Sequence, residues 1–157
     1  MAEATDLALL APVPLMHLQS GQKICESEGK VAFGSRDYRL FEKLDGMLEG
    51  ERAVALIYAS EAREQDLPRV TWKARYIGHL RSRGGAHPDG TRFRPPTTSD
   101  YPEDNAGYWA VFWEVVELAP IDRLEERVLI RTLRGLGSRR ALGAAFVPHG
   151  PILVEYP

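Results

Sequence analysis

Two charged side chains near the start of the chain, Lys23 and Glu26, have the residue types for acid–base chemistry. A lysine and a carboxylate three residues apart are neighbours on a helical turn but point to opposite faces of a strand. They act together only if this segment turns, and Gly21 favours a turn there. In a cleft, Lys23 would anchor an anion or act as a desolvated base, and Glu26 would accept hydrogen bonds from a nucleobase edge. On the surface they would form an ordinary ion pair, and both interpretations stay open.

A second group of residues combines aromatic rings with cations, which is typical of single-stranded nucleic-acid binding. Residues 69–94 hold seven arginines or lysines against the single acid Asp89. This predicts a basic strand-and-loop surface that contacts phosphates, with a solvated charged face as the alternative. Most rings are expected to pack in the core, and Trp72 and Trp109 are the most favoured exceptions because their strands also carry charges. The candidate binding residues of this group are Trp72, Lys73, Arg75, Arg81 and Trp109.

Histidine and cysteine offer weaker candidates. His149 lies between Pro148 and Gly150, in a turn that would present its imidazole to a cleft or simply to water. Cys25, the only cysteine, has no activating histidine beside it and is expected to be a core or idle thiol. The four histidines show no short metal-ligand spacing, so we predict neither a metal site nor a cofactor. Phosphate-binding glycine loops and the GxSxG and HExxH motifs are absent from the sequence, which excludes the common hydrolase classes that need them.

Local patterns predict the elements that must position these residues. Apolar residues recur with a helical period from Leu40 to Leu48, with Ser35 or Asp37 as the cap and Gly50 at the end. Residues 53–59 are a continuous apolar run, typical of a strand covered on both faces. Residues 70–77 alternate with a period of two, which predicts a strand with one wet face. Residues 108–118 are the most β-prone stretch and predict the best-packed strand.

The two ends of the chain are less regular. Residues 1–14 are small and apolar and contain Pro12 and Pro14, which predicts an extended, loosely held lead-in before a single domain over residues 15–157. The last segment, from residue 141 to residue 156, predicts two short strands or one bent strand. The N-terminus and the C-terminus are therefore both expected to be extended.

Two further segments lie on either side of the strand predicted over residues 108–118. Residues 84–107 form a long Gly- and Pro-rich loop that is either functional or poorly ordered, because little of it can be buried. Asp122 and Glu125 have the spacing of a capping box, which predicts a helix to about Leu133. The loop would stand beside the basic strand, and the helix would follow the strand over residues 108–118.

These elements show no regular alternation of strand and helix, which predicts an α+β domain with a small, mostly antiparallel curled sheet or β-barrel and two peripheral helices. The chain has 157 residues, 44% of them hydrophobic, and a formal net charge of −2, enough for one core. Its apolar runs are all shorter than the about 20 residues that span a bilayer. The first residues lack the basic start of a secretion signal, so a cytoplasmic protein without membrane contact is predicted.

The segment Gly21-x-Lys23-x-x-Glu26, placed after a short apolar helix, resembles the motif of ASCH domains in the PUA-like superfamily. Residues 50–60 resemble the apolar strand of ASCH and EVE domains, which ends in a small polar residue, here Ser60. Residues 109–121 resemble their long barrel strand, so the resemblance covers most of residues 14–121. It implies a small β-barrel associated with RNA. If Lys23, Glu26, Ser60 and an exposed tryptophan form its site, they must converge on one concave surface. The chain differs from the ASCH pattern at Glu28, where the family has an arginine.

Three functions follow as expectations. The first is a nucleic-acid-binding module for RNA or a modified or extruded nucleotide, with a base in the barrel cleft and phosphates on the basic surface. The alternative is an amidohydrolase acting on an acylated modified nucleoside, because some ASCH-like proteins have this activity. Lys23 would then be the catalytic base, with Glu26 beside it where those enzymes have threonine. A protein-interaction or regulatory domain is the second alternative.

Overall fold

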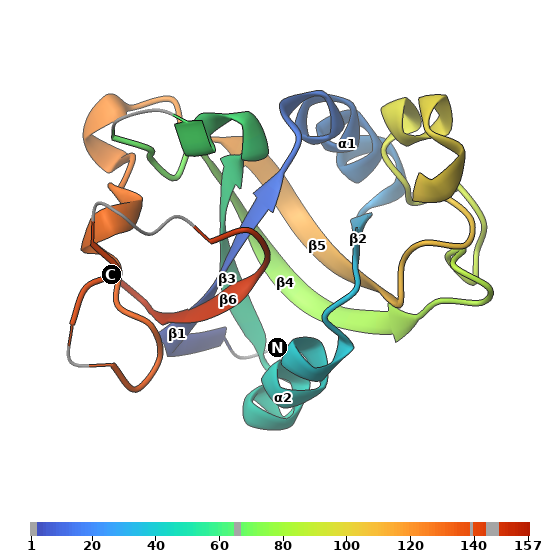
Figure 1. Ribbon diagram of the computed structural model, residues 1–157. Helices are drawn as coiled ribbons and strands as arrows, with labels where there is room; N and C mark the ends of the chain where they lie inside the picture. The colour runs from blue at the N-terminus through green and yellow to red at the C-terminus, as the bar shows by residue number, and fades with distance from the viewer. Residues whose placement is uncertain (1–2, 65–66, 139, 144–147) are drawn as a thin grey trace.

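The chain folds around one curled six-stranded sheet, which Figure 1 shows. The computed structural model describes residues 3–64, 67–138, 140–143 and 148–157. The strands are β1 (Glu3–Val13), β2 (Val31–Ser35), β3 (Arg52–Ala59), β4 (Trp72–Arg81), β5 (Val111–Pro120) and β6 (Ile152–Glu155). Their order in the sheet is β2-β5-β4-β3-β1-β6, and only the β1–β3 pairing is parallel. The predicted α+β class with a mostly antiparallel curled sheet is confirmed. In the described part of the chain the edge strands β2 and β6 do not pair, so the sheet is not a closed barrel.

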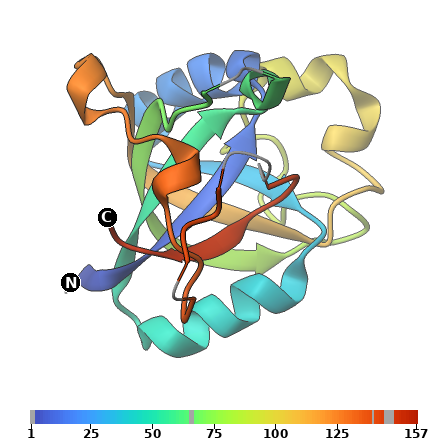
Figure 2. The same cartoon turned by 60° about the vertical axis from the view of Figure 1, so that its left-hand side comes forward.

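Two helices cover opposite ends of this sheet, with α1 (Leu15–Glu28) and α2 (Tyr38–Leu48) on either side of the strands in Figure 2. The Asp37 carboxylate accepts a hydrogen bond from the backbone N–H of Leu40 at 3.2 Å and so caps α2. Gly50, with a φ of 88°, follows the end of α2 in the left-handed region. The predicted helix after Asp37 is confirmed. The structure shows no helix among the described residues that is long and apolar enough to cross a membrane.

The predicted strands over residues 53–59, 70–77 and 108–118 correspond to β3, β4 and β5, which lie side by side in the sheet. β3 is buried on both faces from Ala53 to Tyr58. In β4 the inner residues from Trp72 to Tyr76 alternate with the exposed Lys73 and Arg75, as the period of two predicts. The main core fills the inside of the curl, between the sheet and the two helices.

The N-terminal segment is a strand of the sheet, and the prediction of a loosely held lead-in is wrong. Residues 8–10 have no exposed surface, because β1 lies between β3 and β6 and is covered on both faces. The prolines do not interrupt the pairing, because β6 pairs only with residues 7–10 and Pro12 lies beyond it. The apolar run before Pro12 therefore outweighs the proline signal.

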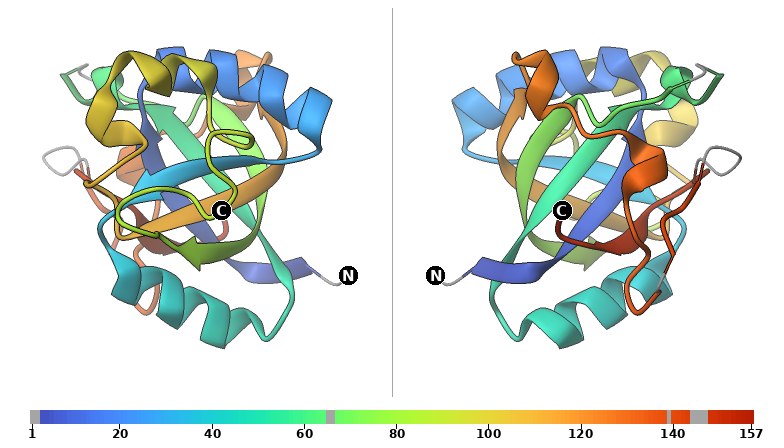
Figure 3. Two further views of the ribbon diagram at one scale, coloured as in Figure 1. Left: turned by 90° about the vertical axis from the view of Figure 1, so that its right-hand side faces the viewer. Right: turned by 90° about the vertical axis from the view of Figure 1, so that its left-hand side faces the viewer.

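The predicted helix over residues 122–133 is also wrong. Only two short 3-10 turns form there, over Leu124–Glu126 and Ile130–Thr132. The backbone N–H of Val70 donates to the carbonyl of Val128 at 2.8 Å, so the chain is extended where it passes residues 68–70. This segment lies across the outer side of the sheet (Figure 3, right), and Ile130 and Leu133 are buried against it. Burial of these apolar side chains outweighs the preference of Asp122 and Glu125 to cap a helix.

The loop over residues 84–107 lies over β2 and β5 (Figure 3, left) and contains the 3-10 turns Pro96–Asp100 and Pro102–Asp104. His87, Phe93, Arg94 and Thr98 are buried in it. The expectation of little buried surface was therefore wrong, because the loop contributes both an aromatic ring and hydrogen-bonded polar groups to the interior. At the C-terminus, β6 is one of the two strands expected after residue 141, and residues 144–147 lie outside the described part.

Candidate functional site

Lys23 and Glu26 lie on the exposed surface of α1. The segment is helical, so Lys23 and Glu26 are neighbours on a turn as their joint action requires. The motif, however, lies inside a helix rather than after one. Leu18, Gly21 and Cys25 form the buried stripe of α1, which leaves positions 23 and 26 on the side facing water. The expected placement of Lys23 and Glu26 in a cleft is therefore wrong.

The predicted basic strand is divided between two places. Lys73 and Arg75 line a cavity of about 520 Å³ on the outer face of β4 and β5. Three cations and three acids line this cavity, namely Lys73, Arg75, Arg123, Glu117, Asp122 and Glu126. Arg75 contacts Glu117 at 2.6 Å, and Arg81 contacts Glu42 of α2 at 3.0 Å. Because the charges balance, this cavity is a poor site for a phosphate backbone.

The remaining candidate residues also lie at different places in the structure. Trp72 is 6% exposed and belongs to the core, so its predicted exposure is wrong, whereas Trp109 is only partly buried. Ser60 donates to Glu61 at 3.2 Å, and the Glu61 carboxylate accepts from the backbone N–H of Leu15 at 3.1 Å. Ser60 thus lies near the N-terminus of α1. His149 is exposed in its turn and is not among the residues that line the pocket beside that terminus.

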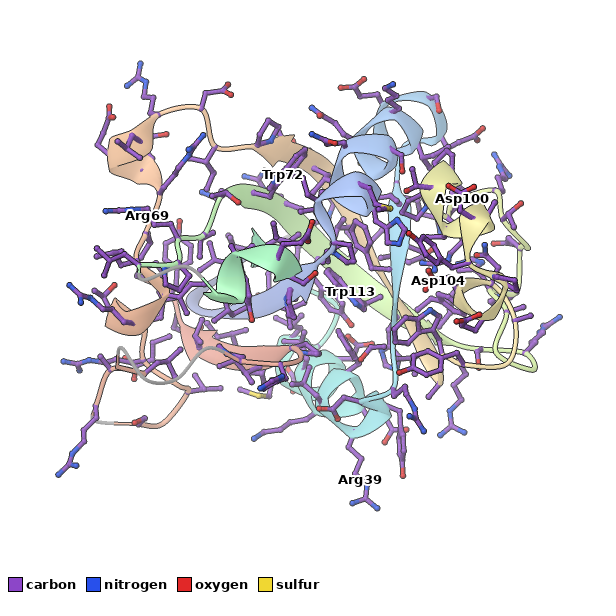
Figure 4. All side chains as sticks on the ribbon, turned by 45° about the horizontal axis from the view of Figure 1, so that its top comes forward. Arg39, Arg69, Trp72, Asp100, Asp104 and Trp113 are labelled. Carbon is purple, nitrogen blue, oxygen red and sulfur yellow. The ribbon has the colours of Figure 1, made fainter. Side chains whose placement is uncertain are left out.

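A pocket of about 160 Å³ lies between the end of β1 and the edge strand β2, where the sheet does not close; we call it the seam pocket. β1, α1, β2 and the 84–107 loop all contribute to it. In Figure 4 the labelled Asp104 marks the loop side of this region, next to β2. The lining residues are Pro12, Val13, Pro14, His17, Phe33, Gly34, Arg94, Thr98, Asp104 and Trp109. Trp109 is the only sequence-predicted site residue among them.

Trp109 covers the outer face of β2 at Gly34. A Cβ atom at position 34 would lie 2.4 Å from the indole ring, so only glycine permits this contact. The indole Nε1–H donates to Asp104 Oδ1 at 3.2 Å. The Tyr108 ring packs edge-on against the indole, with the two ring centroids 4.5 Å apart. The indole is thus held by both its polar and apolar groups at the pocket wall.

The backbone edge of β2 forms another wall. The Ala32 N–H donates to the Phe93 carbonyl at 2.8 Å, and Arg94 Nη1 donates to the Ala32 carbonyl at 2.8 Å. Residues two apart in a strand direct their backbone groups to the same side, so the N–H and C=O of Gly34 also point away from β5. Neither group of Gly34 has a hydrogen-bond partner on that side within the described ranges. The pocket therefore presents one free backbone donor and one free backbone acceptor.

Arg94 holds the loop against this edge. It is 3% exposed, and besides Ala32 it donates from Nε to Asn105 Oδ1 at 3.0 Å and from Nη2 to the Asp104 carbonyl at 2.9 Å. Burial lowers the pKa of Arg94 to about 10, and the opposite charge of Asp104 acts against this shift. The guanidinium is still charged at neutral pH.

His17 lies opposite Asp104 and is 8% exposed. Its Nδ1 is 2.7 Å from Thr97 Oγ1, and its Nε2 is 3.5 Å from Asp104 Oδ2. Burial lowers the pKa of His17 below its ordinary 6.5; Asp104 acts in the opposite direction, and Arg94 adds to the lowering.

Comparison with family models, with curated proteins and with solved structures finds no match. The likeness to ASCH and EVE domains stays a prediction.

Sequence reasoning missed the seam pocket because its polar residues come from three distant segments with no common spacing. It also missed the cluster beneath the loop in which the buried Glu114 and His87 meet the partly exposed Lys30. The one signal for this cluster is a lone carboxylate, Glu114, within the most apolar strand. Within the described residues, no group of three or more His, Cys, Asp or Glu side chains is arranged to hold a metal ion.

A second polar cluster joins α2 to β4. Asp45 accepts hydrogen bonds from Tyr76 Oη at 2.5 Å and contacts His79 Nδ1 at 2.6 Å. A β-bulge between Tyr76 and Gly78 inserts one extra residue, which returns His79 to the inner face that Tyr76 occupies. The bulge therefore explains why two residues three apart on one strand contact the same carboxylate.

Proposed function

We propose that the chain is a nucleic-acid-binding module that takes one base of RNA, or a modified or extruded nucleotide, into the seam pocket. The observation that carries the proposal is the combination of an indole wall at Trp109 with the free backbone donor and acceptor of Gly34. Recognition of an unstacked base needs such an aromatic neighbour together with hydrogen bonds to the base edge. At about 160 Å³, the pocket is smaller than the about 300–1,000 Å³ of sites for drug-sized ligands. It suits one small planar group.

A short series of residues leads from the seam pocket to the surface. The Tyr108 ring contacts Trp109, and the Arg36 guanidinium lies over the Tyr108 ring at 5.2 Å. Both Tyr108 and Arg36 are exposed, and no acid pairs with Arg36 in the described part of the chain. A cation next to aromatic rings suits the backbone of the nucleotides that flank a bound base. Arg36 therefore replaces Lys73 and Arg75 as the proposed phosphate contact.

Trp109→Ala is expected to weaken the binding of short single-stranded RNA by about 1–3 kcal/mol, because base–aromatic stacking contributes that much per base. Fluorescence anisotropy of a labelled hexanucleotide, titrated at low salt, measures the change. The same titration with single-stranded DNA gives the preference between the two nucleic acids.

Tyr156→Ala is the matched control, because Tyr156 is also a partly exposed aromatic residue but lines the cavity on the outer face of β4 and β5. It should bind like the parent. If the parent does not bind at low salt, or if the Tyr156 variant loses binding while the Trp109 variant keeps it, the proposed site is wrong.

Arg36→Ala is expected to make the slope of log affinity against log salt shallower by about one unit, because one phosphate contact is lost. Affinities measured across a salt series give this slope directly. Arg81→Ala serves as the comparison, since Arg81 is paired with Glu42 of α2. Equal slopes for the parent and the Arg36 variant would remove Arg36 from the phosphate path.

The amidohydrolase alternative loses its structural support, because it depended on Lys23, which is exposed on α1 away from the seam pocket. It is tested by incubation with N4-acylated cytidine and comparison of the parent with Lys23→Ala.

We also propose a cytoplasmic location for the protein. This proposal is supported by the single unpaired thiol of Cys25, because a free thiol suits a reducing compartment.

A further inference from the structure

The cavity of about 520 Å³ on the outer face of β4 and β5 continues into a second hollow of about 430 Å³. Both are lined by Lys73, Ile121, Glu126 and Tyr156. The two hollows are therefore parts of one cavity, which we call the outer cavity. It shares no lining residue with the seam pocket, and it lies on the side of the sheet that faces the viewer in Figure 3 (right). Each hollow has the volume of a small-molecule site, about 300–1,000 Å³.

The second hollow is mainly apolar. Leu56 of β3 and Val70 are buried residues of the apolar cluster on the outer side of the sheet and form its floor. Ile121 and Val128 pack against this cluster and keep part of their surface exposed, and the Tyr156 ring is 39% exposed. An apolar group of a ligand that contacts these three residues would remove apolar surface from water.

Two opposite charges lie where the hollows meet. Lys73 and Glu126 line both hollows, and in the described part of the chain neither forms an ion pair or a side-chain hydrogen bond. They do not pair with each other either, so both charged groups are available to a ligand. Asp122 and Arg123, which line only the first hollow, add one further charge of each sign.

A β-bulge keeps the neighbouring cation, Arg75, occupied. Lys73 pairs with Ala119 and Arg75 with Val116, so β5 has one extra residue at this place. Glu117 in the bulge has a φ of 56°, in the left-handed region that residues other than glycine seldom adopt. Its carboxylate lies 2.6 Å from Arg75 Nη1. Lys73 is therefore the cation beside the apolar hollow that has no acid bound to it in the described residues.

We propose that the outer cavity binds a small zwitterion with an apolar side chain, the chemistry of a free amino acid such as phenylalanine or of a short apolar peptide. The ligand carboxylate pairs with Lys73 and the ligand ammonium pairs with Glu126. The apolar side chain lies against Ile121, Val128 and Tyr156. A simple anion would face the acids of this cavity and a simple cation would face its basic residues, whereas a zwitterion complements both. The proposal concerns a site separate from the seam pocket and does not depend on nucleic-acid binding.

The test is a chemical-shift titration of the isotope-labelled full chain with phenylalanine and three analogues. Alanine lacks the ring, N-acetylphenylalanine lacks the ammonium group, and phenylalaninamide lacks the carboxylate. Each is expected to bind about fivefold more weakly than phenylalanine, because each loses one ion pair or the buried apolar surface. The shifts caused by phenylalanine should fall on the backbone amides of Ile121, Val128 and Tyr156. The dipeptide of two phenylalanines distinguishes the sources, since tighter binding than phenylalanine indicates a peptide and weaker binding indicates the free amino acid.

Two charge-removing variants assign the roles. Lys73→Gln should bind phenylalanine and phenylalaninamide equally, because the partner of the carboxylate is gone. Glu126→Gln should bind phenylalanine and N-acetylphenylalanine equally, because the partner of the ammonium group is gone. The matched controls Lys43→Gln on α2 and Glu125→Gln change exposed residues outside the outer cavity and should behave like the parent. All four positions are exposed, and the amide spectrum of each variant checks its fold.

Three results would overturn the inference. The first is equal affinity of the parent for phenylalanine and its two charge-blocked analogues. The second is the absence of shifts up to the solubility limit of phenylalanine, and the third is a set of shifts centred on another surface, such as that around Trp109. None of these results bears on the proposed function, because hexanucleotide binding is measured separately at the seam pocket.

Discussion

Replacing Trp113 with alanine is expected to lower the free energy of unfolding by about 3–5 kcal/mol, the usual cost of removing a large aromatic residue from a core. Trp113 is 2% exposed, and it lies at the centre of the molecule in Figure 4. Its ring centroid is 4.9 Å from that of Phe33 on β2, and it stacks on Phe41 of α2 at 6.1 Å. The indole therefore joins three elements, which cannot all move inward to fill the space that it leaves.

Urea unfolding followed by circular dichroism measures this loss without relying on tryptophan fluorescence. Tyr108→Ala, which truncates an aromatic residue that is 46% exposed, is the comparison and should cost less than about 1 kcal/mol. Equal midpoints for the parent and the Trp113 variant would mean that the ring is not part of the core.

Glu114→Gln is expected to destabilise the protein by about 2–4 kcal/mol, because it disrupts the polar cluster beneath the loop, in which Glu114 and His87 are buried. Lys30 Nζ lies 3.0 Å from Glu114 Oε1, and His87 Nε2 lies 3.2 Å from Oε2. The Asp89 N–H donates to His87 Nδ1 at 3.0 Å, which leaves the ring proton on Nε2, facing Glu114. Glutamine offers one acceptor and one amide, so one of the two donors would face another donor. Thermal unfolding at pH 7 measures the loss, with Glu117→Gln on the outer face as the control.

The difference in stability between the parent and Glu114→Gln is expected to depend on pH. Burial raises the pKa of Glu114, but hydrogen bonds from His87 and Lys30 outweigh it and hold the pKa below the ordinary 4.5. The contribution of the carboxylate to stability is thus fully present above pH 4.5 and is lost as the pH falls through the lower folded-state value. The difference in stability between the parent and Glu114→Gln should shrink below about pH 4.5. A difference that stays constant into strong acid would contradict this account.

Local sequence patterns correctly predicted the helices and strands whose conformation depends on residues close together in the chain. The cap at Asp37 and the helical period after it define α2, and the apolar run and the alternation define β3 and β4. Trp109 could be proposed as a site residue on the same basis, because its aromatic ring occurs beside charged residues at the start of an apolar strand. These inferences need only spacing along the chain.

The sequence alone determined the α+β class, the helix α2 and the strands β3, β4 and β5. The tertiary structure alone decided that the N-terminal segment joins the sheet, that residues 122–133 are not a helix, and that His17, Gly34 and Asp104 line one pocket. The physical reason lies in the range of the forces. Helical periods and caps act between residues up to four apart, whereas the seam pocket exists only where remote segments are buried together and the curled sheet stays open. Its hydrogen-bonding groups meet there without any spacing in the chain that records it.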